Sequence, residues 1–535
     1  MSRLELGLVR RRWFGLLSGF LFLTALFILR FLPAGQTRFA LDEAYNAGWA
    51  RLIVNGDPFM HKVVTDKPPQ LYYLLAASFK LFGESEAAAR LPNALLGAML
   101  ILPLWGLARR LYPAQPAVAL LACGLLALSP LAQVYAPTVY TDPLMSFWLL
   151  VCAWLVTARR WPWAGLALGL SICAQQQALF FLPFPVFLAL LIIAWDSSFI
   201  FKAGLFGLQK AGSRFLAWAV MPALAVVIFD YWRGQVSSLI YGAAVNGDKL
   251  GLAGLGAWPQ RLANWWEKVL QYFFIPNPLG LVLVALLLVY SGWLAWRLWL
   301  ARFYVSVEAR KQATTEAFAH LGDLALVAGI VVILLFHTAV TFPIWDRYLL
   351  PMVPFTALLM ARALVWGSSL ILPGYSRPNW KIAGVALVVL ALMVGPVAQA
   401  GAYKLPLGGD YLAFGGRGRG AHQAYDGIEL LATFFINNAP TGSVVFHEEL
   451  GWHFSYYLFG LPLEFSSTQP LAPAQVASIA AKSPAYVVFG DWQQASYLHL
   501  SEGLAAFNLM LEEAYDVYPD NGERLSFAVY FVAKK

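Results

Sequence analysis

The amino-acid sequence predicts a polytopic α-helical membrane protein with a small α/β domain at its C-terminal end. The 535 residues are 60% hydrophobic and only 12% charged, about half the charged fraction of an average soluble domain. Apolar runs of about 20 residues, the length that crosses a bilayer, recur from residue 13 to residue 400. After residue 401 the pattern changes to short strands and helical stretches that are separated by turns.

This composition excludes a soluble enzyme, a disordered chain and a disulfide-stapled secreted module as descriptions of the whole protein. The formal net charge of +8 could suggest nucleic acid as a partner. In an apolar chain, however, excess Lys and Arg more often orients helices in a bilayer, so we expect no nucleic-acid partner. Cys123, Cys152 and Cys173 lie in apolar runs without metal-ligand spacing, so we interpret them as core residues.

The apolar runs predict about eleven membrane-spanning helices. Their count depends on one segment, residues 161–195, which crosses either once as a kinked helix or twice as two short ones. Two crossings place all basic loop clusters on the inner side, as the positive-inside rule favours. The clusters are residues 109–110, 159–160, 202–214, 297–311 and 377–381. The predicted spans lie near 13–33, 87–108, 116–137, 140–158, 161–175, 178–195, 214–232, 277–299, 322–342, 347–366 and 381–400.

We therefore expect a transmembrane domain over 1–400, a glycine-rich linker over 401–420 and a soluble extracytoplasmic α/β domain over 421–535. The first outer loop covers 34–86, and the second large outer loop covers 231–276. In the tail, the expected strands are 443–447, 485–489 and 526–533, and the expected helices are 422–437 and 473–482.

The first outer loop concentrates ionisable residues, which are scarce elsewhere. Asp42 and Glu43 open a helical stretch, where the helix dipole favours carboxylates. Successive helical residues point about 100° apart, so the two side chains cannot address one reacting atom. One could act as a base while the other serves the structure. If this pair stood alone, ordinary helix-terminal charges would be the simpler interpretation.

Lys67 precedes Pro68 and Pro69, which delay the start of an apolar, aromatic helix over 71–82. This order predicts a cation where a polar loop meets the membrane surface, the depth of a lipid phosphate. The alternative is a lysine that snorkels or pairs with Asp66.

Four motifs occur together in this order: Asp42-Glu43-Ala-Tyr45, Lys67-Pro68-Pro69-x-x-Tyr72-Tyr73, Phe82-Gly83-x-Ser85-Glu86-x-Ala-Ala-Arg90-Leu91-Pro92 and Arg347-Tyr348-Leu-Leu-Pro351. In these residues the sequence resembles the GT-C membrane glycosyltransferases of the protein O-mannosyltransferase and lipid A aminoarabinose transferase superfamily. The resemblance covers roughly residues 10–400 and is weaker in the tail.

The resemblance implies a GT-C fold and transfer of a hexosyl or pentosyl group from a polyprenyl-phosphate donor, with inversion. The acceptor would be a lipid, a glycan or a protein at the outer face of the cell (inner) membrane. The implied general base is Asp42, with Glu43 beside it as the second catalytic candidate. Lys67, Arg347 and Tyr348 are implied at the donor phosphate. These roles agree with physical expectation, because fixed cations stabilise a leaving phosphate and a carboxylate can accept the acceptor's proton.

Further candidates are less specific. Tyr45 and Tyr72 stand in the motifs as candidate substrate contacts, and Asp142 begins a helix, as either a substrate contact or a cap. Gln175, Gln176 and Gln177 lie where many relatives carry a lysine followed by a glycine, so the resemblance gives no third phosphate-binding cation here. The three amides either bind sugar hydroxyls, with Gln175 and Gln177 as the candidates, or join helices. Arg261 precedes Trp265 and Trp266 in the second outer loop, which is either an interfacial belt or a lid that places Arg261 near the donor phosphate.

No metal site is predicted. His447 and His453 are six residues apart and do not share a helix face, so we interpret them as polar residues at strand ends. The resemblance does not decide whether a divalent cation takes part. Some GT-C enzymes use one, and Asp42, Glu43 and Asp142 could supply oxygen ligands.

Two other functions compete with the transferase. A transporter or flippase of lipid-linked saccharides would need ionisable residues deep within its spans, whereas Asp230 and Asp323 lie near predicted span ends. A catalytically inactive GT-C-like scaffold would not need Asp42, Lys67 and Arg347 together.

Overall fold

The computed structural model describes residues 19, 21–28, 37–197, 201–247, 251–268, 278–304, 315–342, 345–371, 425–519 and 525–535. The chain divides into two compact units. The first unit contains residues 1–32, 59–71 and 91–407, and the second contains residues 33–58, 72–90 and 408–535. Most of the predicted 13–33 span, the 381–400 span and the 401–420 linker lie outside the described residues.

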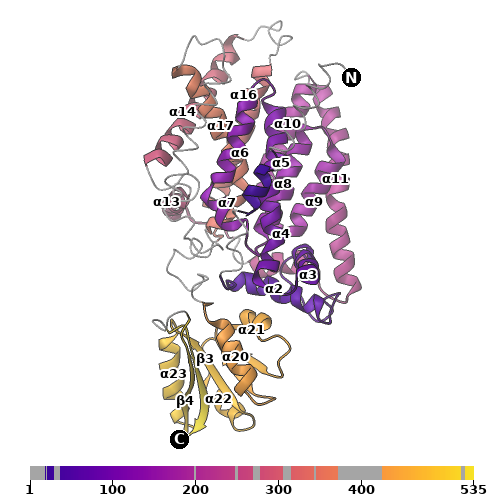
Figure 1. Ribbon diagram of the computed structural model, residues 1–535. Helices are drawn as coiled ribbons and strands as arrows, with labels where there is room; N and C mark the ends of the chain where they lie inside the picture. The colour runs from indigo at the N-terminus through magenta and orange to yellow at the C-terminus, as the bar shows by residue number, and fades with distance from the viewer. Residues whose placement is uncertain are drawn as a thin grey trace. The chain divides into compact units, whose positions relative to one another are not determined.

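The first unit is a bundle of helices (Figure 1). Prolines divide several predicted spans: 116–137 breaks at Ser129-Pro130, and 347–366 begins as a 3-10 helix containing Pro351. The elements are α4 (Glu86–Met99, shared with the second unit), α5 (Ile101–Leu111), α6 (Pro116–Leu128), α7 (Pro130–Tyr135), α8 (Asp142–Thr157), α9 (Trp161–Ala174), η1 (Gln176–Phe181), α10 (Pro183–Asp196), α11 (Phe201–Trp232), α12 (Ser238–Gly247), η2 (Leu255–Ala257), α13 (Trp258–Lys268), α14 (Pro278–Tyr304), α16 (Thr315–Ala339), η4 (Asp346–Met352) and α17 (Val353–Ile371).

Residues 161–195 form a helical hairpin rather than one kinked helix. Gln175 has an extended backbone, with φ −160° and ψ 131°, which ends α9 before η1 and α10 begin. Arg159, before α9, forms an ion pair with Asp196, at the end of α10, with an Nη2–Oδ1 distance of 2.5 Å. The start of α9 and the end of α10 therefore meet, as two antiparallel passes require.

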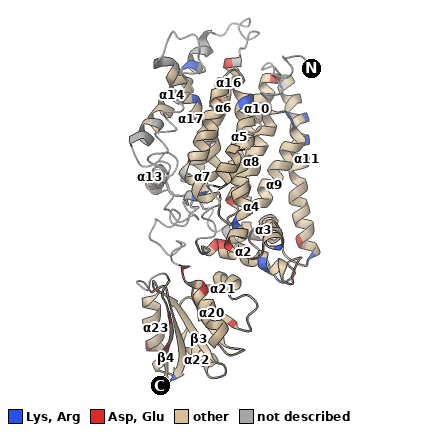
Figure 2. Cartoon of the chain, in the orientation of Figure 1, with Lys and Arg blue, Asp and Glu red and all other residues tan. Residues whose placement is uncertain are grey.

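Among the described residues, five helices are long and apolar enough to cross a membrane, and four shorter apolar helices accompany them. The total of eleven crossings stays a prediction. The described residues of three basic clusters, 109–110, 159–160 and 202–214, gather at one end of the bundle. A Cβ on Gly106 of α5 would overlap Trp154 of α8, so residues 109–110 lie near the end of α8 and the Arg159–Asp196 pair. The start of α11, with its Lys and Arg residues, lies there too (Figure 2).

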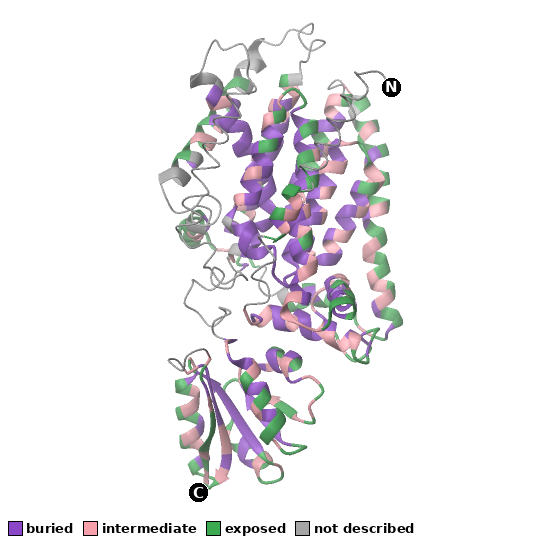
Figure 3. Ribbon diagram, viewed as in Figure 1, coloured by how far each residue is buried: buried purple, intermediate pink, exposed green. Residues whose placement is uncertain are grey.

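Burial divides the bundle into inner and outer helices. Most residues of α8 and α17 are buried, whereas α11 exposes Leu216, Val220, Leu224 and Ile228 (Figure 3). Such a fully apolar helix surface is typical of contact with lipid. Helix α11 starts at Phe201, thirteen residues before the predicted span.

Helices α9 and α11 pack closely because two glycines face the second helix. A Cβ at Gly165 would lie 2.0 Å from the carbonyl oxygen of Phe215, and one at Gly169 would lie 2.4 Å from that of Ala219. Two small residues four apart allow helix backbones to approach in this way in membranes.

The second unit contains a five-stranded sheet in the order β2-β1-β3-β5-β4. Strand β1 pairs in parallel with β2 and β3, while β5 is antiparallel to β3 and β4. The elements of the tail are α20 (Ile428–Asn438), β1 (Val444–His447), α21 (Gly451–Tyr457), β2 (Glu464–Ser467), α22 (Pro473–Ala480), β3 (Ala485–Gly490), α23 (Gln494–Ala505), β4 (Leu509–Val517) and β5 (Phe527–Lys534).

The sheet is covered on both faces. Alternate residues of a strand point to opposite faces, and Val445 packs in a core with α20 and α21, whereas Val444 and Phe446 pack with α22 and α23. Figure 1 shows α20 and α23 on opposite faces of the sheet.

The second unit also includes most of the first outer loop. Helix α2 (Leu41–Val54), most of α3 (Gln70–Phe82) and the first turn of α4 belong to it. The loop is attached to α21: Phe39 N–H donates to the hydroxyl of Tyr457 (3.2 Å), and the Phe39 carbonyl bonds to His453 Nε2 (2.9 Å). No pattern in the sequence indicated that these distant segments form one unit.

The glycine contact between α9 and α11 yields a stability prediction. Replacing Gly169 with Leu should lower the thermal unfolding temperature of the detergent-solubilised protein, because the side chain collides with α11 backbone and overpacking costs about 1–3 kcal/mol. The control is Gly212→Leu on α11, where a Cβ meets nothing within 4 Å. Equal effects of the two substitutions would contradict the close packing.

Candidate active site

Glu43 is fully buried and is held by the guanidinium of Arg90, which is buried as well. Arg90 Nε donates to Oε1 at 3.0 Å and Nη2 donates to Oε2 at 2.7 Å. Arg90 also donates to the backbone carbonyls of Thr37 and Arg38. Glu43 accepts the Ala40 backbone N–H (3.2 Å) as well. This carboxylate therefore fixes the start of α2 and faces away from solvent.

Asp42 is the second residue of α2 and is half-buried, in contrast to its neighbour. Residues three and seven positions further along lie on the same side of a helix, which groups Asp42 with Tyr45 and Trp49. The Tyr45 ring packs against Trp452 at 4.5 Å, Trp49 at 5.5 Å and Tyr72 at 6.4 Å between centroids. The Asp42 carboxylate thus lies on the same face of α2 as the aromatic rings of Tyr45 and Trp49.

Helix α21 supports this part of the loop through a short polar chain. The Tyr457 hydroxyl, which accepts from Phe39, donates to Glu86 Oε1 at 3.0 Å. Burial and the nearby Glu86 charge raise the pKa of Tyr457 well above its usual value, so the hydroxyl keeps its proton. Arg38 bridges Glu86 and Glu429, of α20, at 3.0 and 2.8 Å.

In the first unit, Lys67 is half-buried at the end of an irregular segment, residues 59–69. Gln176 holds this segment: its side-chain amide donates to the carbonyls of Asp66 and Ser238, both at 3.1 Å. A Cβ on Gly242 would lie 1.8 Å from the Asp66 carbonyl oxygen, so α12 approaches the same peptide closely. The backbone beside Lys67 is therefore fixed in place.

A buried ion pair holds the other end of the segment. Arg233 Nη1 donates to the carbonyls of Met60 (2.5 Å) and Val63 (2.8 Å). Asp230 accepts from Arg233 Nε at 2.9 Å and from the Ser238 backbone N–H at 2.7 Å. All of these groups belong to the first unit, so Asp230 and Arg233 are structural partners of the Lys67 segment.

Gln175 and Gln177 form an amide chain beside α8. Gln175 Nε2 donates to Gln177 Oε1 at 2.7 Å, and Gln175 Oε1 accepts from the Thr141 hydroxyl at 3.0 Å. Asp142 follows Thr141 as the first residue of α8 and is buried, at a position where the helix dipole favours a carboxylate. Gln175 thereby joins helices, one of the two roles expected for it.

Arg347 is surrounded by aromatic rings. Its guanidinium carbon lies 4.6 Å from the ring centroid of Trp345, 4.8 Å from that of Tyr140 and 5.7 Å from that of Tyr348. Tyr348 packs in turn on Phe342. Flat rings fix a guanidinium by cation–π attraction without neutralising it.

These contacts place Lys67 and Arg347 at the same end of the bundle. Asp66 contacts Gln176, Gln175 contacts Thr141, and Tyr140 contacts Arg347. The first unit thus brings together two predicted phosphate ligands, the glutamines and Asp142. Asp42, Glu43, Tyr45 and Tyr72 belong to the second unit.

Arg261 has a well-defined structural role. Its guanidinium donates to the carbonyls of His337 (3.0 Å), Thr338 (3.1 Å) and Phe342 (2.8 Å) at the C-terminal end of α16. Cations at this position satisfy unpaired carbonyls and the helix dipole. Of the two tryptophans that follow, Trp265 is buried and Trp266 is exposed.

Within the described residues, no group of three or more His, Cys, Asp or Glu side chains could hold a metal ion. His447 ends β1, as expected for a residue at a strand end, and burial lowers its pKa to about 4. His453 instead lies on α21, where it stacks on Tyr425 at 3.8 Å between centroids.

A second buried ion pair lies within the bundle. Asp323 of α16 accepts from Arg362 Nε (3.2 Å), from the Tyr112 hydroxyl (2.6 Å) and from the Tyr290 hydroxyl (2.5 Å). Both carboxylate oxygens accept hydrogen bonds, so the pair joins α14, α16, α17 and the residue that follows α5.

Sequence reasoning did not assign roles to Arg90 or Arg233, and it did not predict that Gln176 would hold the Lys67 segment. A signal was present for Arg90, the lone cation at the start of an apolar helix, and for Arg233, three residues after Asp230 at the end of another. No sequence pattern distinguished Gln176 from its two neighbours.

Residues 66–232 match the family model "Dolichyl-phosphate-mannose-protein mannosyltransferase". Among solved structures, the chain is similar to ArnT from Cupriavidus metallidurans bound to undecaprenyl phosphate, at 16% identity and a TM-score of 0.58 over 96% of this chain and 97% of ArnT. The chain has the GT-C fold. The apo state of the same ArnT matches at 15% identity and a TM-score of 0.58, over 97% and 98% of the two chains. The comparison with curated proteins gives no match.

The resemblance implied the GT-C fold, and the structural match confirms that fold. The match to the family model covers α3 to α11 and begins at Asp66, one residue before Lys67.

The Gln176 contacts predict a local effect. Gln176→Ala should speed amide hydrogen exchange in residues 62–67 about fivefold or more, because each lost hydrogen bond is worth about 1 kcal/mol. Exchange mass spectrometry of the full chain measures this. Gln260→Ala is the matched control, since Gln260 bonds only within α13, to Asn264. Unchanged exchange in residues 62–67 would show that Gln176 does not hold the segment.

Proposed function

We propose that this protein transfers a sugar from a polyprenyl-phosphate donor to an acceptor at the outer face of the cell membrane, with inversion. The observation that carries the proposal is the pair Lys67 and Arg347, which are fixed by different contacts at one end of a bundle with a GT-C fold. A solved protein of this fold binds undecaprenyl phosphate. We place the acceptor among lipids, glycans and proteins, and the transferred group among hexoses and pentoses.

The two cations act on the leaving group. The acceptor oxygen attacks the anomeric carbon, the bond from that carbon to the phosphate oxygen breaks, and its electron pair leaves with the phosphate. Negative charge on the phosphate increases as the bond breaks, and preorganised cations stabilise it at little reorganisation cost. The aromatic rings around Arg347 fix the guanidinium by cation–π contacts, so its position is set before the phosphate binds.

Asp42 accepts the proton of the attacking hydroxyl. A positioned carboxylate contributes about 10²–10⁴-fold to such a step. We assign this role to Asp42 rather than Glu43, because Glu43 is fully buried and engaged by Arg90. Glu43 then acts as a positioning residue that fixes the first turn of α2.

The remaining candidates would contact the sugar. Tyr45, half-buried and supported by the buried Tyr72 ring, offers a ring face on which a sugar can pack, and we propose Gln177 and Asp142 as polar contacts for its hydroxyls. Arg261 holds the Phe342 carbonyl beside Tyr348, so we propose that it positions the Arg347 motif rather than binding the phosphate itself.

The experiment that tests this function is sugar transfer by the purified full chain, with a panel of radiolabelled polyprenyl-phosphate sugars and membrane-extract acceptors. Asp42→Asn should lower kcat by about 10²–10⁴-fold and leave the Kd for undecaprenyl phosphate unchanged. Lys67→Gln and Arg347→Gln should instead weaken undecaprenyl phosphate binding, each by about tenfold or more, because a charge-assisted hydrogen bond is lost.

Glu512→Gln, on the exposed surface of β4, is the control and should leave both quantities unchanged. Full transfer by Asp42→Asn would refute the base assignment. Wild-type affinity in both cation variants would refute the phosphate site.

A further inference from the structure

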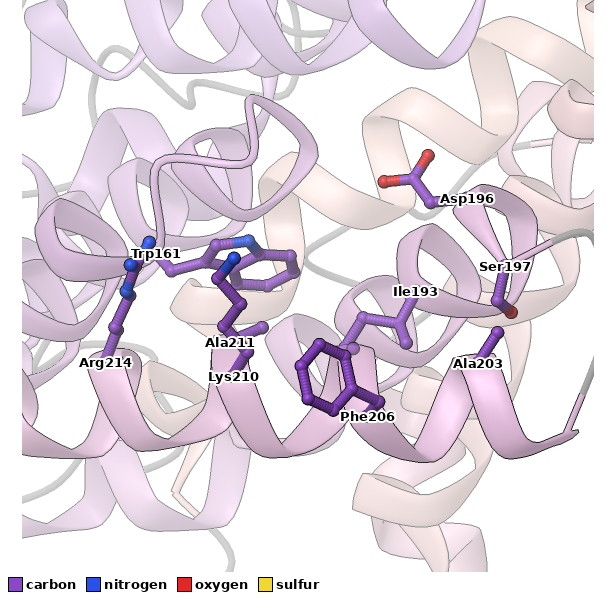
Figure 4. Close-up of a pocket in the computed structure, with 10 residues that line it drawn as sticks. Trp161, Ile193, Asp196, Ser197, Ala203, Phe206, Lys210, Ala211 and Arg214 are labelled. Atoms are coloured by element: carbon purple, nitrogen blue, oxygen red, sulfur yellow. The ribbon is translucent and has the colours of Figure 1, made fainter.

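A pocket of about 330 Å³ opens at the opposite end of the bundle from Gln175 and Arg347. It lies between the start of α9, the end of α10 and the first turns of α11. Lys210, Arg214 and Trp161 line one part of it, and Ile193 and Phe206 line the apolar part (Figure 4). No function discussed above uses this pocket.

The pocket is positively charged. Figure 4 shows Lys210 and Arg214 extending from α11 on the side of Trp161, whereas Asp196 lies on the other side. Asp196 is paired with Arg159 through two hydrogen bonds. Within the described part of the chain, Lys210 and Arg214 form no ion pair, so two cations face an opening beside an indole.

The length of α11 places these cations at the depth of lipid headgroups. After Arg214 the helix has no ionisable residue until Asp230, a rise of about 24 Å at 1.5 Å per residue. This rise, together with the length of an arginine side chain that extends toward the headgroups, matches the roughly 30 Å thickness of the hydrocarbon core. Met221 and Ile228, seven and fourteen residues after Arg214 on the same stripe, are exposed apolar residues that face lipid.

We propose that this pocket binds the headgroup phosphate of an anionic phospholipid. Lys210 and Arg214 bind the phosphodiester, the Trp161 indole lies at the interface as tryptophans do, and Ile193 and Phe206 contact the first acyl carbons. Basic pockets between membrane helices are suited to anionic lipid headgroups. A free anion would not need the apolar half of the pocket or its position beside the lipid-facing stripe.

Native mass spectrometry of the full chain in detergent, titrated with phosphatidylglycerol or phosphatidylcholine, tests this inference. Each cation near a membrane surface contributes about fivefold to affinity. Lys210→Gln and Arg214→Gln should therefore each weaken phosphatidylglycerol binding about fivefold, and the double variant about 30-fold. Phosphatidylcholine binding should be weaker and unaffected by the substitutions.

Arg110→Gln is the matched control, because Arg110 is an exposed arginine at the same end of the bundle and does not line the pocket. Arg214→Lys, which keeps the charge, should retain binding and so separates loss of charge from misfolding. Wild-type phosphatidylglycerol binding in the double variant would overturn the proposal, as would equal binding of the two lipids. Complete displacement of the lipid by millimolar inorganic phosphate would show a free-anion site and overturn it too.

Discussion

The buried ion pair between Arg90 and Glu43 determines the geometry of the first outer loop. Arg90 donates to the Glu43 carboxylate and to two backbone carbonyls ahead of α2, so one side chain fixes both the loop and the helix start. Removing one member of such a pair leaves an uncompensated buried charge, which costs about 3–5 kcal/mol. The orientation of Asp42 depends on this arrangement, since the helix turns it about 100° away from Glu43.

The two proposed phosphate ligands are fixed by different forces. Lys67 follows Asp66, whose backbone carbonyl accepts a hydrogen bond from Gln176 and packs closely against Gly242. Arg347 is held through its side chain, by ring faces. In both cases the contacts set the position of the cation through uncharged groups, an amide in one case and aromatic rings in the other. The Asp230–Arg233 and Asp323–Arg362 pairs are instead buried ion pairs that join segments of the first unit.

The sequence was sufficient for features that depend on local chemistry. Apolar length predicted the helices, and the positions of the basic loop residues favoured the two passes over 161–195 that α9 and α10 make. Helix geometry also predicted that Asp42 and Glu43 point in different directions, and the structure buries Glu43 fully and Asp42 only partly. Features set by contacts between distant residues were not predictable: Phe39 bonds to His453 and Tyr457, about 415 positions away. Strands β2 and β4 were missed because these edge strands are mostly exposed and show no clear alternation of buried apolar and exposed polar residues.

The measurement that tests the central claim most directly is a double-mutant cycle on the ion pair. The free energy of unfolding of the full chain is compared among wild type, Glu43→Gln, Arg90→Met and the double variant. If the pair fixes the loop, each single variant loses several kcal/mol and the double variant loses little more, which gives a coupling energy of about 2–3 kcal/mol. Additive effects with no coupling would contradict the claim that Glu43 is structural and leaves the chemistry to Asp42.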